Sequence, residues 1–272
     1  MSGIKLVTLP IGNKDDITIR AKNIIIETKN IYCEDTRVFK DLCKRIEVDY
    51  STKQIRSYHD HSSDKSLETI LNIAMNEDCI FVSDAGSPLI SDPAYPLIEK
   101  AILSDIEIDS IGGISAVTTA LELSGLPPTP FHFHGFLARD KGKILSFASE
   151  IKTQYGTHIF FEGVSRVIKT LEILTEEMPQ YKFAIGRELT KDYQSVHRFI
   201  GSEFSEIKKD IIEKGEFVIL INNPEKTESI SGDVKNLVEE ILSKGAKPKL
   251  ISKLISELSG LNAKEVYEKI SR

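Results

Sequence analysis

Hydrophobic and polar positions in the first 125 residues switch repeatedly between two periods. Short apolar runs of strand length occur at Ile4–Leu9, Asn30–Cys33, Gln54–Tyr58, Cys79–Val82 and Ile106–Ile111. Between these runs, apolar residues recur at helical spacing from about Ile17, over Thr36–Arg45, over Ser66–Met75, from Ala94 and from Ser115. Strands that alternate with helices form a parallel sheet covered by helices. We therefore expect an α/β domain with a parallel sheet over residues 1–125, its first helix capped by Asp15 or Asp16.

The pattern changes after Leu126-Pro127-Pro128, where we place a domain boundary. Strand-like runs now follow one another at Phe131–His134, His158–Phe161, Tyr181–Ile185, His197–Ile200 and Phe217–Ile221. The apolar positions of Val164–Met178 form one face of a helix. Consecutive strands with little helix between them indicate a mixed sheet, so we expect a second α/β domain over residues 126–224.

The last part of the chain, residues 225–272, reads as a linker and a basic helical tail. Asn222–Thr227 has the composition of a linker, and three short helices are expected at Ser231–Leu242, Lys247–Leu258 and Asn262–Ile270. From residue 243 onward the chain carries seven Lys or Arg against three Glu, although its net charge is −6. This basic tail fits a surface that contacts phosphates, through Lys247 and Lys249, and a solvated helical face stays open as the alternative.

Composition narrows the class of protein. With 40% hydrophobic and 28% charged residues, the chain is typical of a soluble globular protein. Because no apolar run approaches the roughly 20 residues of a membrane helix and no signal peptide precedes the first strand, we expect a cytoplasmic protein. Three cysteines without a Cys-x-x-Cys pair predict neither a disulfide framework nor a thiolate metal site.

Four loops rich in Gly, Pro or polar residues follow predicted strands of the first domain. They cover residues 9–13, 34–37, 83–93 and 112–116. The carboxyl ends of parallel strands lie along one edge of a sheet, where ligands bind, so a ligand cleft is expected there. The chain lacks Gly-x-Gly-x-x-Gly after its first strand and lacks a phosphate loop, which disfavours a dinucleotide or ATP. Asp84 near this edge suits a cationic or zwitterionic ligand.

These motifs carry a resemblance to a known family. Four motifs resemble, in order and spacing, the ribosomal RNA small subunit methyltransferase I family of the tetrapyrrole-methylase superfamily. They are Pro10–Asn13 (Pro-Ile-Gly-Asn), Glu34–Arg37 (Glu-Asp-Thr-Arg), the eleven residues Ser83–Pro93 and Arg187–Lys191 (Arg-Glu-Leu-Thr-Lys). The similarity extends from Leu6 to about Ile221 and continues near Leu258–Leu261. The chain departs from the family pattern at Phe161–Arg166 (Phe-Glu-Gly-Val-Ser-Arg), where the family usually has Tyr-Glu-Ser-Pro-His-Arg.

The resemblance implies two α/β domains of tetrapyrrole-methylase type with the cofactor cleft between them, a homodimer, and S-adenosylmethionine as cofactor. It also implies 2′-O-methylation of a cytidine in small-subunit (16S) ribosomal RNA. By similarity, the cofactor contacts fall on Pro10, Ile11, Asp84, Ala85, Gly86, Leu89, Ser115, Ala116, Phe161 and Leu189.

Methyl transfer to a ribose hydroxyl needs alignment of the reacting atoms and either a base or a cation that stabilises the forming alkoxide. On the expected substrate side the polar groups are Glu34, Asp35, Arg37, His59, Glu188 and Lys191. We expect Asp35 or His59 to accept the proton and Arg37 and Lys191 to hold phosphate or offset charge. Capping of a helix is the alternative role for Glu34–Arg37.

Two further patterns invite a function. The basic loop with Arg139, Lys141 and Lys143 is expected to contact RNA, or else is a plain exposed loop. The pairs His59/His61 and His132/His134 have a spacing that could bind a metal, but no metal site is expected because the polar face of a half-exposed strand explains the second pair better.

Other functions on the same fold are methylation of a tetrapyrrole or of a diphthamide precursor. A non-catalytic assembly factor that binds S-adenosylmethionine or RNA is a further alternative.

Overall fold

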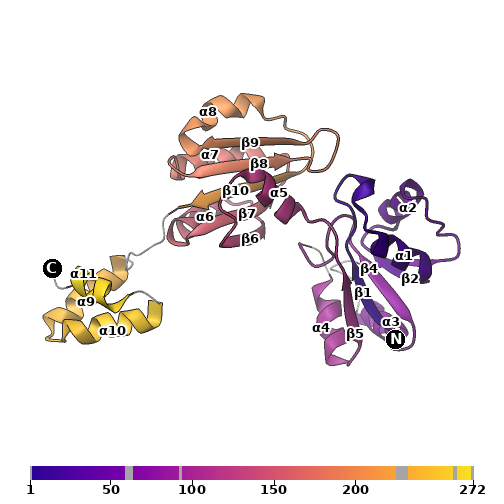
Figure 1. Ribbon diagram of the computed structural model, residues 1–272, viewed down its shortest axis with the longest axis horizontal. Helices are drawn as coiled ribbons and strands as arrows, with labels where there is room; N and C mark the ends of the chain where they lie inside the picture. Colours follow the sequence, from indigo (N-terminus) through magenta and orange to yellow (C-terminus); the bar gives the residue numbers. More distant parts are fainter. Residues whose placement is uncertain (1, 59–63, 92–93, 225–231, 260–261, 271–272) are drawn as a thin grey trace. The chain divides into compact units, whose positions relative to one another are not determined.

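The computed structural model describes residues 2–58, 64–91, 94–224, 232–259 and 262–270. The chain forms two compact units, one of residues 1–152 with 156–224 and one of residues 153–155 with 225–272 (Figure 1). The first unit contains two five-stranded sheets, and the second is helical.

The first sheet is parallel throughout, as the alternation of strands and helices predicted. Its strands lie in the order β3-β2-β4-β1-β5. Their bounds are β1 Gly3–Val7, β2 Asn30–Cys33, β3 Gln54–Ser57, β4 Asp78–Val82 and β5 Glu107–Ile111. The apolar side chains of β1, β2 and β4 are buried, because helices cover both faces of the sheet.

Four helices provide that cover. The helices α1 (Ile19–Glu27) and α2 (Thr36–Arg45) pack on one face, and α3 (Asp64–Ala74) and α4 (Tyr95–Leu103) pack on the other. The predicted cap of α1 is wrong. Thr18 caps this helix by accepting a hydrogen bond from the Ala21 amide at 3.1 Å, while Asp15 and Asp16 lie in the preceding 3₁₀ turn η1 (Lys14–Asp16).

The second sheet is mixed, which confirms the predicted α/β class with two sheets. Its order is β6-β7-β10-β8-β9, in which β6 runs parallel to β7 and the other neighbours are antiparallel. The strands are β6 Phe131–Phe136, β7 Gly156–Glu162, β8 Lys182–Arg187, β9 Ser195–Ile200 and β10 Phe217–Asn223. Three short helical segments, η2 (Gly201–Glu203), α8 (Phe204–Ile207) and η3 (Lys208–Asp210), separate β9 from β10.

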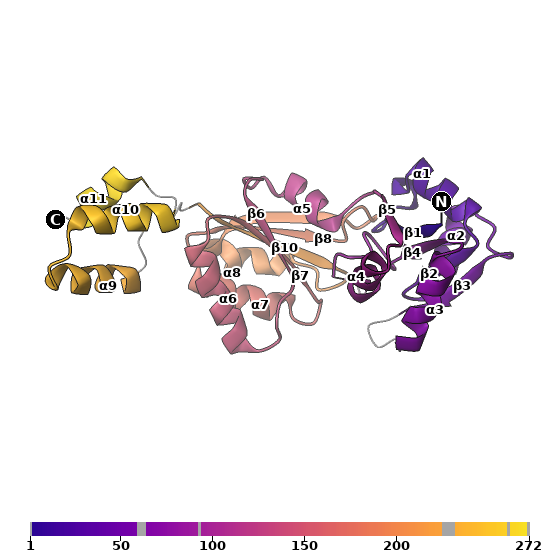
Figure 2. The same cartoon turned by 90° about the horizontal axis from the view of Figure 1, so that it is seen from below.

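Helices lie on both faces of this sheet as well (Figure 2). On one face, α6 (Lys141–Thr153) and α7 (Val167–Glu177) contribute to a large apolar cluster. On the other, α5 (Ala116–Ser124) packs against β7, β8 and β10. The expected boundary between residues 125 and 126 stays a prediction, but the core places α5 with the second sheet.

Two sequence predictions fail near this sheet. Asn222 and Asn223 are the last residues of buried strand β10 instead of linker residues. Their amides are satisfied inside the protein, since the Asn222 Nδ2 donates to the Thr157 hydroxyl at 3.2 Å and the Asn223 Nδ2 donates to the Ile151 carbonyl at 2.8 Å. Lys141, expected in a loop, is the first residue of α6.

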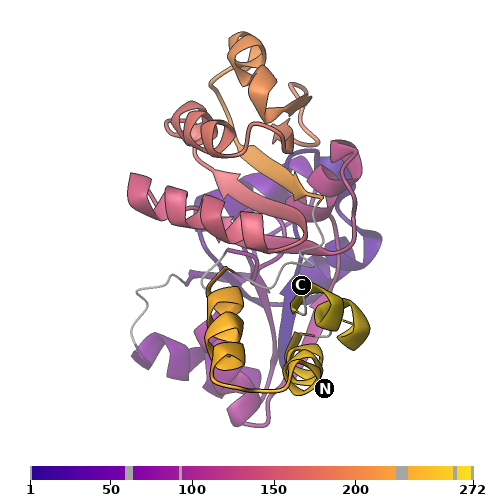
Figure 3. The same cartoon turned by 90° about the vertical axis from the view of Figure 1, so that its left-hand side faces the viewer.

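The second unit consists of α9 (Gly232–Ser243), α10 (Pro248–Ser259) and α11 (Ala263–Ile270), seen together in Figure 3. These are the three helices that the sequence predicted. Val238, Ile251 and Val266, one from each helix, are buried. Across the described part of the chain, every helix is too short or too polar to cross a membrane.

Candidate functional site

A cleft of about 370 Å³ lies where the four predicted loops meet the second sheet. The loops supply Ile11, Glu34, Asp84–Ser87, Ile90, Ser91, Ser115 and Ala116. The second sheet and its loops supply Phe136, Phe161, Glu162, Gly163 and residues 215–218. The carboxyl ends of the parallel strands therefore form one wall of a cleft whose other wall comes from β7 and β10.

Most of the expected cofactor residues line this cleft. Seven of the ten are on its wall, namely Ile11, Asp84, Ala85, Gly86, Ser115, Ala116 and Phe161. Pro10, Leu89 and Leu189 are not among the lining residues. Leu189 is buried in the core between α5 and the second sheet. That these ten residues bind a cofactor stays a prediction.

The loop after β4 is fixed against the end of β1 by its backbone. Leu9 and Gly86 exchange two backbone hydrogen bonds, at 2.9 and 3.0 Å. The Ser83 hydroxyl is 3.1 Å from the Ala85 carbonyl oxygen, to which it donates. Gly86 has φ of 72°, a left-handed conformation that favours glycine, so the turn depends on this residue type.

Asp35 caps α2, as the alternative interpretation of this motif expected. Its Oδ1 accepts from the Arg37 amide at 2.7 Å, and its Oδ2 lies 2.6 Å from the Arg37 Nη2. The hydrogen bond from the Arg37 side chain is the main cause that holds the pKa of Asp35 well below its usual range. The amide of Asp35 donates to the Asp84 carboxylate at 2.9 Å. A proton-accepting role for Asp35 stays a prediction, and its lowered pKa makes it a weak base.

Glu162 and Arg166 form a buried ion pair in the cleft wall. The Glu162 Oε1 lies 2.5 Å from the Arg166 Nη2, and the Glu162 side chain has no exposed area. The Gly163 amide and the Thr170 hydroxyl each donate to this carboxylate at 2.7 Å. Arg166 also donates from its Nη1 to the Leu137 carbonyl at 3.2 Å, which joins the end of β6 to the turn after β7.

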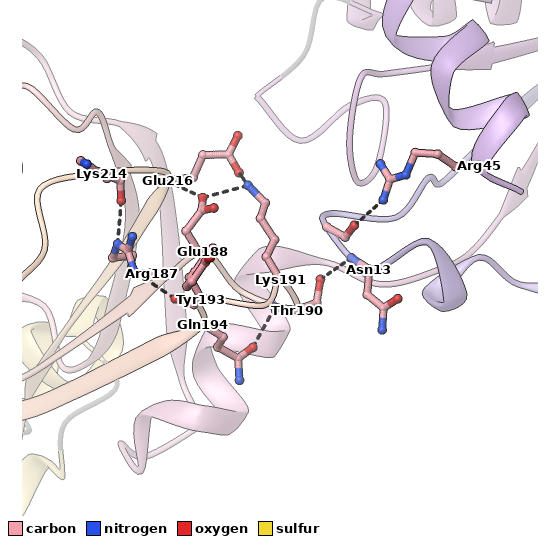
Figure 4. A network of polar contacts seen from close by, with 11 residues as sticks. Asn13, Arg45, Arg187, Glu188, Thr190, Lys191, Tyr193, Gln194, Lys214 and Glu216 are labelled. Carbon is pink, nitrogen blue, oxygen red and sulfur yellow. Dashed lines mark hydrogen bonds and ion pairs between the residues drawn. The ribbon is translucent and has the colours of Figure 1, made fainter.

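Glu188 and Lys191 form a second ionic cluster with Glu216 (Figure 4). The Lys191 Nζ lies 2.9 Å from the Glu188 Oε1 and 2.8 Å from the Glu216 Oε2. Burial raises the pKa of Glu188, but the hydrogen bonds from Lys191 and the Glu216 amide outweigh it, so the net pKa is lowered. Burial lowers the pKa of Lys191, and the two carboxylates turn this into a net rise. These residues brace the loop after β8, and their predicted catalytic roles remain predictions.

The same loop contacts the loop after β1 (Figure 4). The Asn13 amide donates to the Thr190 hydroxyl at 3.1 Å, and the Arg45 Nη2 donates to the Gly12 carbonyl at 3.1 Å. A Cβ on Gly12 would collide with the Lys191 side chain and would lie 3.1 Å from the Leu189 carbonyl. Glycine at position 12 thus permits the two loops to approach each other.

The remaining predicted residues lie elsewhere. His59 and His61 fall outside the described residues. Arg139, Lys141 and Lys143 are exposed at the start of α6, and Lys247 and Lys249 are exposed in the second unit. RNA contact by these five residues stays a prediction.

Three histidines from the neighbouring strands β6 and β7 contact one another. The His134 Nε2 lies 3.0 Å from the His158 Nδ1, and the His132 ring stacks on His158 with 4.9 Å between centroids. Burial lowers the pKa of His134. Among the described residues, no group of three His, Cys, Asp or Glu is arranged to hold a metal ion.

Several cleft residues were missed from the sequence. Phe136 was missed because the predicted strand stopped at His134, whereas β6 continues through Gly135 to Phe136. Residues 215–218 had no local signal, because they reach the cleft only through the antiparallel pairing of Phe217 with Glu162 and of Val218 with Phe161. Such non-local pairing has no signature in a single sequence.

Comparison with known proteins agrees with the resemblance. Residues 3–205 match the family described as Tetrapyrrole (Corrin/Porphyrin) Methylases. A Rickettsia prowazekii protein named ribosomal RNA small subunit methyltransferase I is 36% identical over 269 residues, 98% of this chain and 94% of its own. A protein of the same name from Hydrogenobaculum sp. is 39% identical over 219 residues, 80% of this chain and 94% of its own.

Solved structures show the same fold. The methyltransferase CobJ aligns with a TM-score of 0.59 and 18% identity over 82% of this chain and 95% of its own. A Thermus thermophilus uroporphyrin-III C-methyl transferase, complexed with S-adenyl homocysteine, aligns with a TM-score of 0.52 and 13% identity over 82% of this chain and 98% of its own. The predicted cofactor, S-adenosylmethionine, is confirmed as that of the family. The chain belongs to the tetrapyrrole methylases and, among them, to the ribosomal RNA small subunit methyltransferase I family.

Proposed function

We propose that this protein transfers a methyl group from S-adenosylmethionine to the 2′-hydroxyl of a cytidine in small-subunit (16S) ribosomal RNA. The observation that carries the proposal is the acidic cleft between the two sheets, in a chain that is 36% identical over 98% of its length to a ribosomal RNA small subunit methyltransferase I.

The cleft suits a cationic nucleoside. Its volume of about 370 Å³ falls within the range of small-molecule sites. The carboxylates of Glu34 and Asp84 line it and favour the sulfonium and ammonium groups of the methyl donor. Glu162 and Glu216 also line the cleft, but their charges are compensated by Arg166 and Lys191. Phe161 and Ile11 supply apolar surface for its nucleoside.

When bound, S-adenosylmethionine supplies a methyl group whose bond to sulfur breaks as the bond to the ribose oxygen forms, while the hydroxyl proton leaves. The chain has to orient that hydroxyl and receive its proton. Among the described polar groups expected on the substrate side, Glu34 lines the cleft, whereas Asp35, Arg37, Glu188 and Lys191 are absent from its lining. We assign to Glu34 the role of orienting the hydroxyl and accepting its proton.

The proposal is tested by methyl transfer to small ribosomal subunits that lack the modification. With radiolabelled S-adenosylmethionine, the wild type should label the RNA, and Glu34→Gln should lower kcat by about 10²–10⁴-fold, the usual contribution of a general base. Glu68→Gln, an exposed substitution on α3, is the matched control and should leave kcat unchanged. A wild-type rate for Glu34→Gln would contradict the assigned role.

Two variants separate the competing roles of the motif after β2. Asp35→Asn should slow methylation only modestly if Asp35 is chiefly a cap, and a loss as large as that of Glu34→Gln would make Asp35 the base. Arg37→Ala should reduce methylation but leave the affinity for S-adenosylmethionine, measured by calorimetry, nearly unchanged. Methylation at the wild-type rate would remove Arg37 from the substrate site.

The same assay distinguishes the other functions. Binding of S-adenosylmethionine without transfer to RNA would favour an assembly factor, and transfer to a tetrapyrrole or diphthamide precursor would favour another methylase on this fold. The homodimer and the cytoplasmic location stay predictions, which sedimentation and cell fractionation would test.

A further inference from the structure

A second cavity, which we call the basic groove, lies beside the cleft. It has a volume of about 560 Å³ and is lined by Gly12, Asn13 and Lys14 after β1, by Arg45 at the end of α2, and by residues 190–192 after β8. The two cavities are neighbours in the chain and in space. Ile11 lines the cleft and Gly12 the groove, while Lys191 in the groove is ion-paired with Glu216 in the cleft wall.

The groove differs from the cleft in charge. Lys14, Arg45 and Lys191 line it against a single carboxylate, that of Asp192. The charge of Lys191 is compensated by Glu188 and Glu216.

Lys14 and Arg45 are the available cations. Both are exposed, and within the described residues neither is ion-paired with a carboxylate. The bonds that they make go to backbone carbonyls instead, from the Lys14 Nζ to Arg45 at 3.4 Å and from the Arg45 Nη2 to Gly12 at 3.1 Å. Arg45 thereby keeps most of its guanidinium donors for a ligand.

The floor of the groove is held in place by the contact between the two loops. The Asn13 amide donates to the Thr190 hydroxyl at 3.1 Å, and the Thr190 amide donates to the Gln194 Oε1 at 2.7 Å. Thr190 has φ of 64°, a conformation unusual for a β-branched residue. The cations are therefore displayed on a braced surface, which lowers the cost of ordering them around an anion.

We propose that the basic groove binds a backbone phosphate of the RNA next to the nucleotide that is methylated. This inference rests on the proposed function. An RNA that places a ribose in the acidic cleft must lead its negatively charged backbone out of it, and the groove offers a cationic surface next to the cleft. The planar guanidinium of Arg45 matches the geometry of a phosphate, and Lys14 adds a point charge beside it.

The test measures the affinity for a fluorescent single-stranded fragment of small-subunit ribosomal RNA between 50 and 200 mM KCl. Lys14→Ala and Arg45→Ala should each weaken binding about tenfold at low salt, as expected for the loss of a charge-assisted hydrogen bond. Each should also reduce the slope of log affinity against log salt by about 0.7, so the difference in affinity from the wild type should shrink about 2.6-fold over this range. Lys44→Ala is the matched control, because Lys44 is exposed one residue before Arg45 and is absent from the groove lining.

Because Arg45 also braces the Gly12 carbonyl, Arg45→Ala alone could act through the loop. Lys14→Ala separates the two effects, and its affinity for S-adenosylmethionine, measured by calorimetry, should equal that of the wild type. Arg45→Lys should restore the salt slope but only part of the affinity.

The outcomes distinguish the groove from the function. If the wild type methylates small subunits and both variants bind RNA like Lys44→Ala, the groove proposal is overturned and the function stands. If the wild type methylates no RNA but both variants lose affinity and slope, the groove stands as an RNA site and the proposed function fails.

Discussion

Replacing Arg166 should show how much the buried ion pair of the cleft wall contributes to the free energy of unfolding. Arg166→Met keeps much of the apolar stem and deletes the charge that faces Glu162 at 2.5 Å. The carboxylate then stays in a site without solvent exposure. Loss of one partner of a buried pair costs about 3–5 kcal/mol.

The lower end of that range applies here. The Arg166 side chain is 26% exposed, and the Gly163 amide and Thr170 hydroxyl still hydrogen-bond the carboxylate. We therefore expect a loss of about 3 kcal/mol in the free energy of unfolding. For a unit of this size the melting temperature should fall by about 6–12 °C.

Urea unfolding followed by circular dichroism measures the loss, with Lys169→Met, an exposed charge removal on α7, as control. Glu162→Gln in the Arg166→Met background should recover part of the stability, because it removes the uncompensated charge. A loss below about 1 kcal/mol, or a double variant no more stable than Arg166→Met alone, would refute the reasoning.

Three further predictions concern other parts of the first unit. The three cysteines are buried, and burial raises the pKa of Cys33 to about 12 and the pKa of Cys43 and Cys79 to about 11. None of these thiols should therefore react with a thiol reagent at pH 8 until urea unfolds the protein. Reaction without urea would contradict this burial. Because burial lowers the pKa of His134 below 6.5 in the folded state, the unfolded chain binds the proton more readily, and stability should fall as the pH drops below about 6.5. The melting temperature of His134→Gln should respond less to this acidification; an equal response would assign the effect to another group. Gly12→Ala should destabilise the protein by about 1–3 kcal/mol, since the added Cβ collides with the Lys191 side chain. Gly112→Ala is the control and should not destabilise the protein, because its Cβ meets open space. Equal melting temperatures for the two variants would contradict the loop contact.

The sequence predicted the elements of both sheets because their periodicity is local. The parallel first sheet and the four loops at its edge followed from strands that alternate with helices, and those loops do converge on one cleft. The helix α6 was missed although its signal is present, since Ile144, Phe147, Ala148 and Ile151 have helical spacing and are buried. The exposed basic residues Arg139, Lys141 and Lys143 at and just before its start are also typical of a surface loop.

The ion-pair partners could not be predicted from the sequence. Lys191 and Glu188 are three residues apart and suggested catalysis, but the partner that completes their cluster, Glu216, comes from a distant loop. Conversely, the departures at Gly163, Val164 and Ser165 leave Glu162 and Arg166 in place, as in the pattern usual for the family. The structure shows why these two matter, because together they form the buried pair of the cleft wall.

The central claim is most directly tested by identifying the methylated nucleoside. Small subunits lacking the modification are incubated with the protein and with S-adenosylmethionine carrying a deuterated methyl group, and the RNA is digested and analysed by mass spectrometry. The account predicts the label in 2′-O-methylcytidine, at a single position and at up to one methyl group per subunit. Label on a base, label on a ribosomal protein, or no transfer by a protein that binds the cofactor would contradict it.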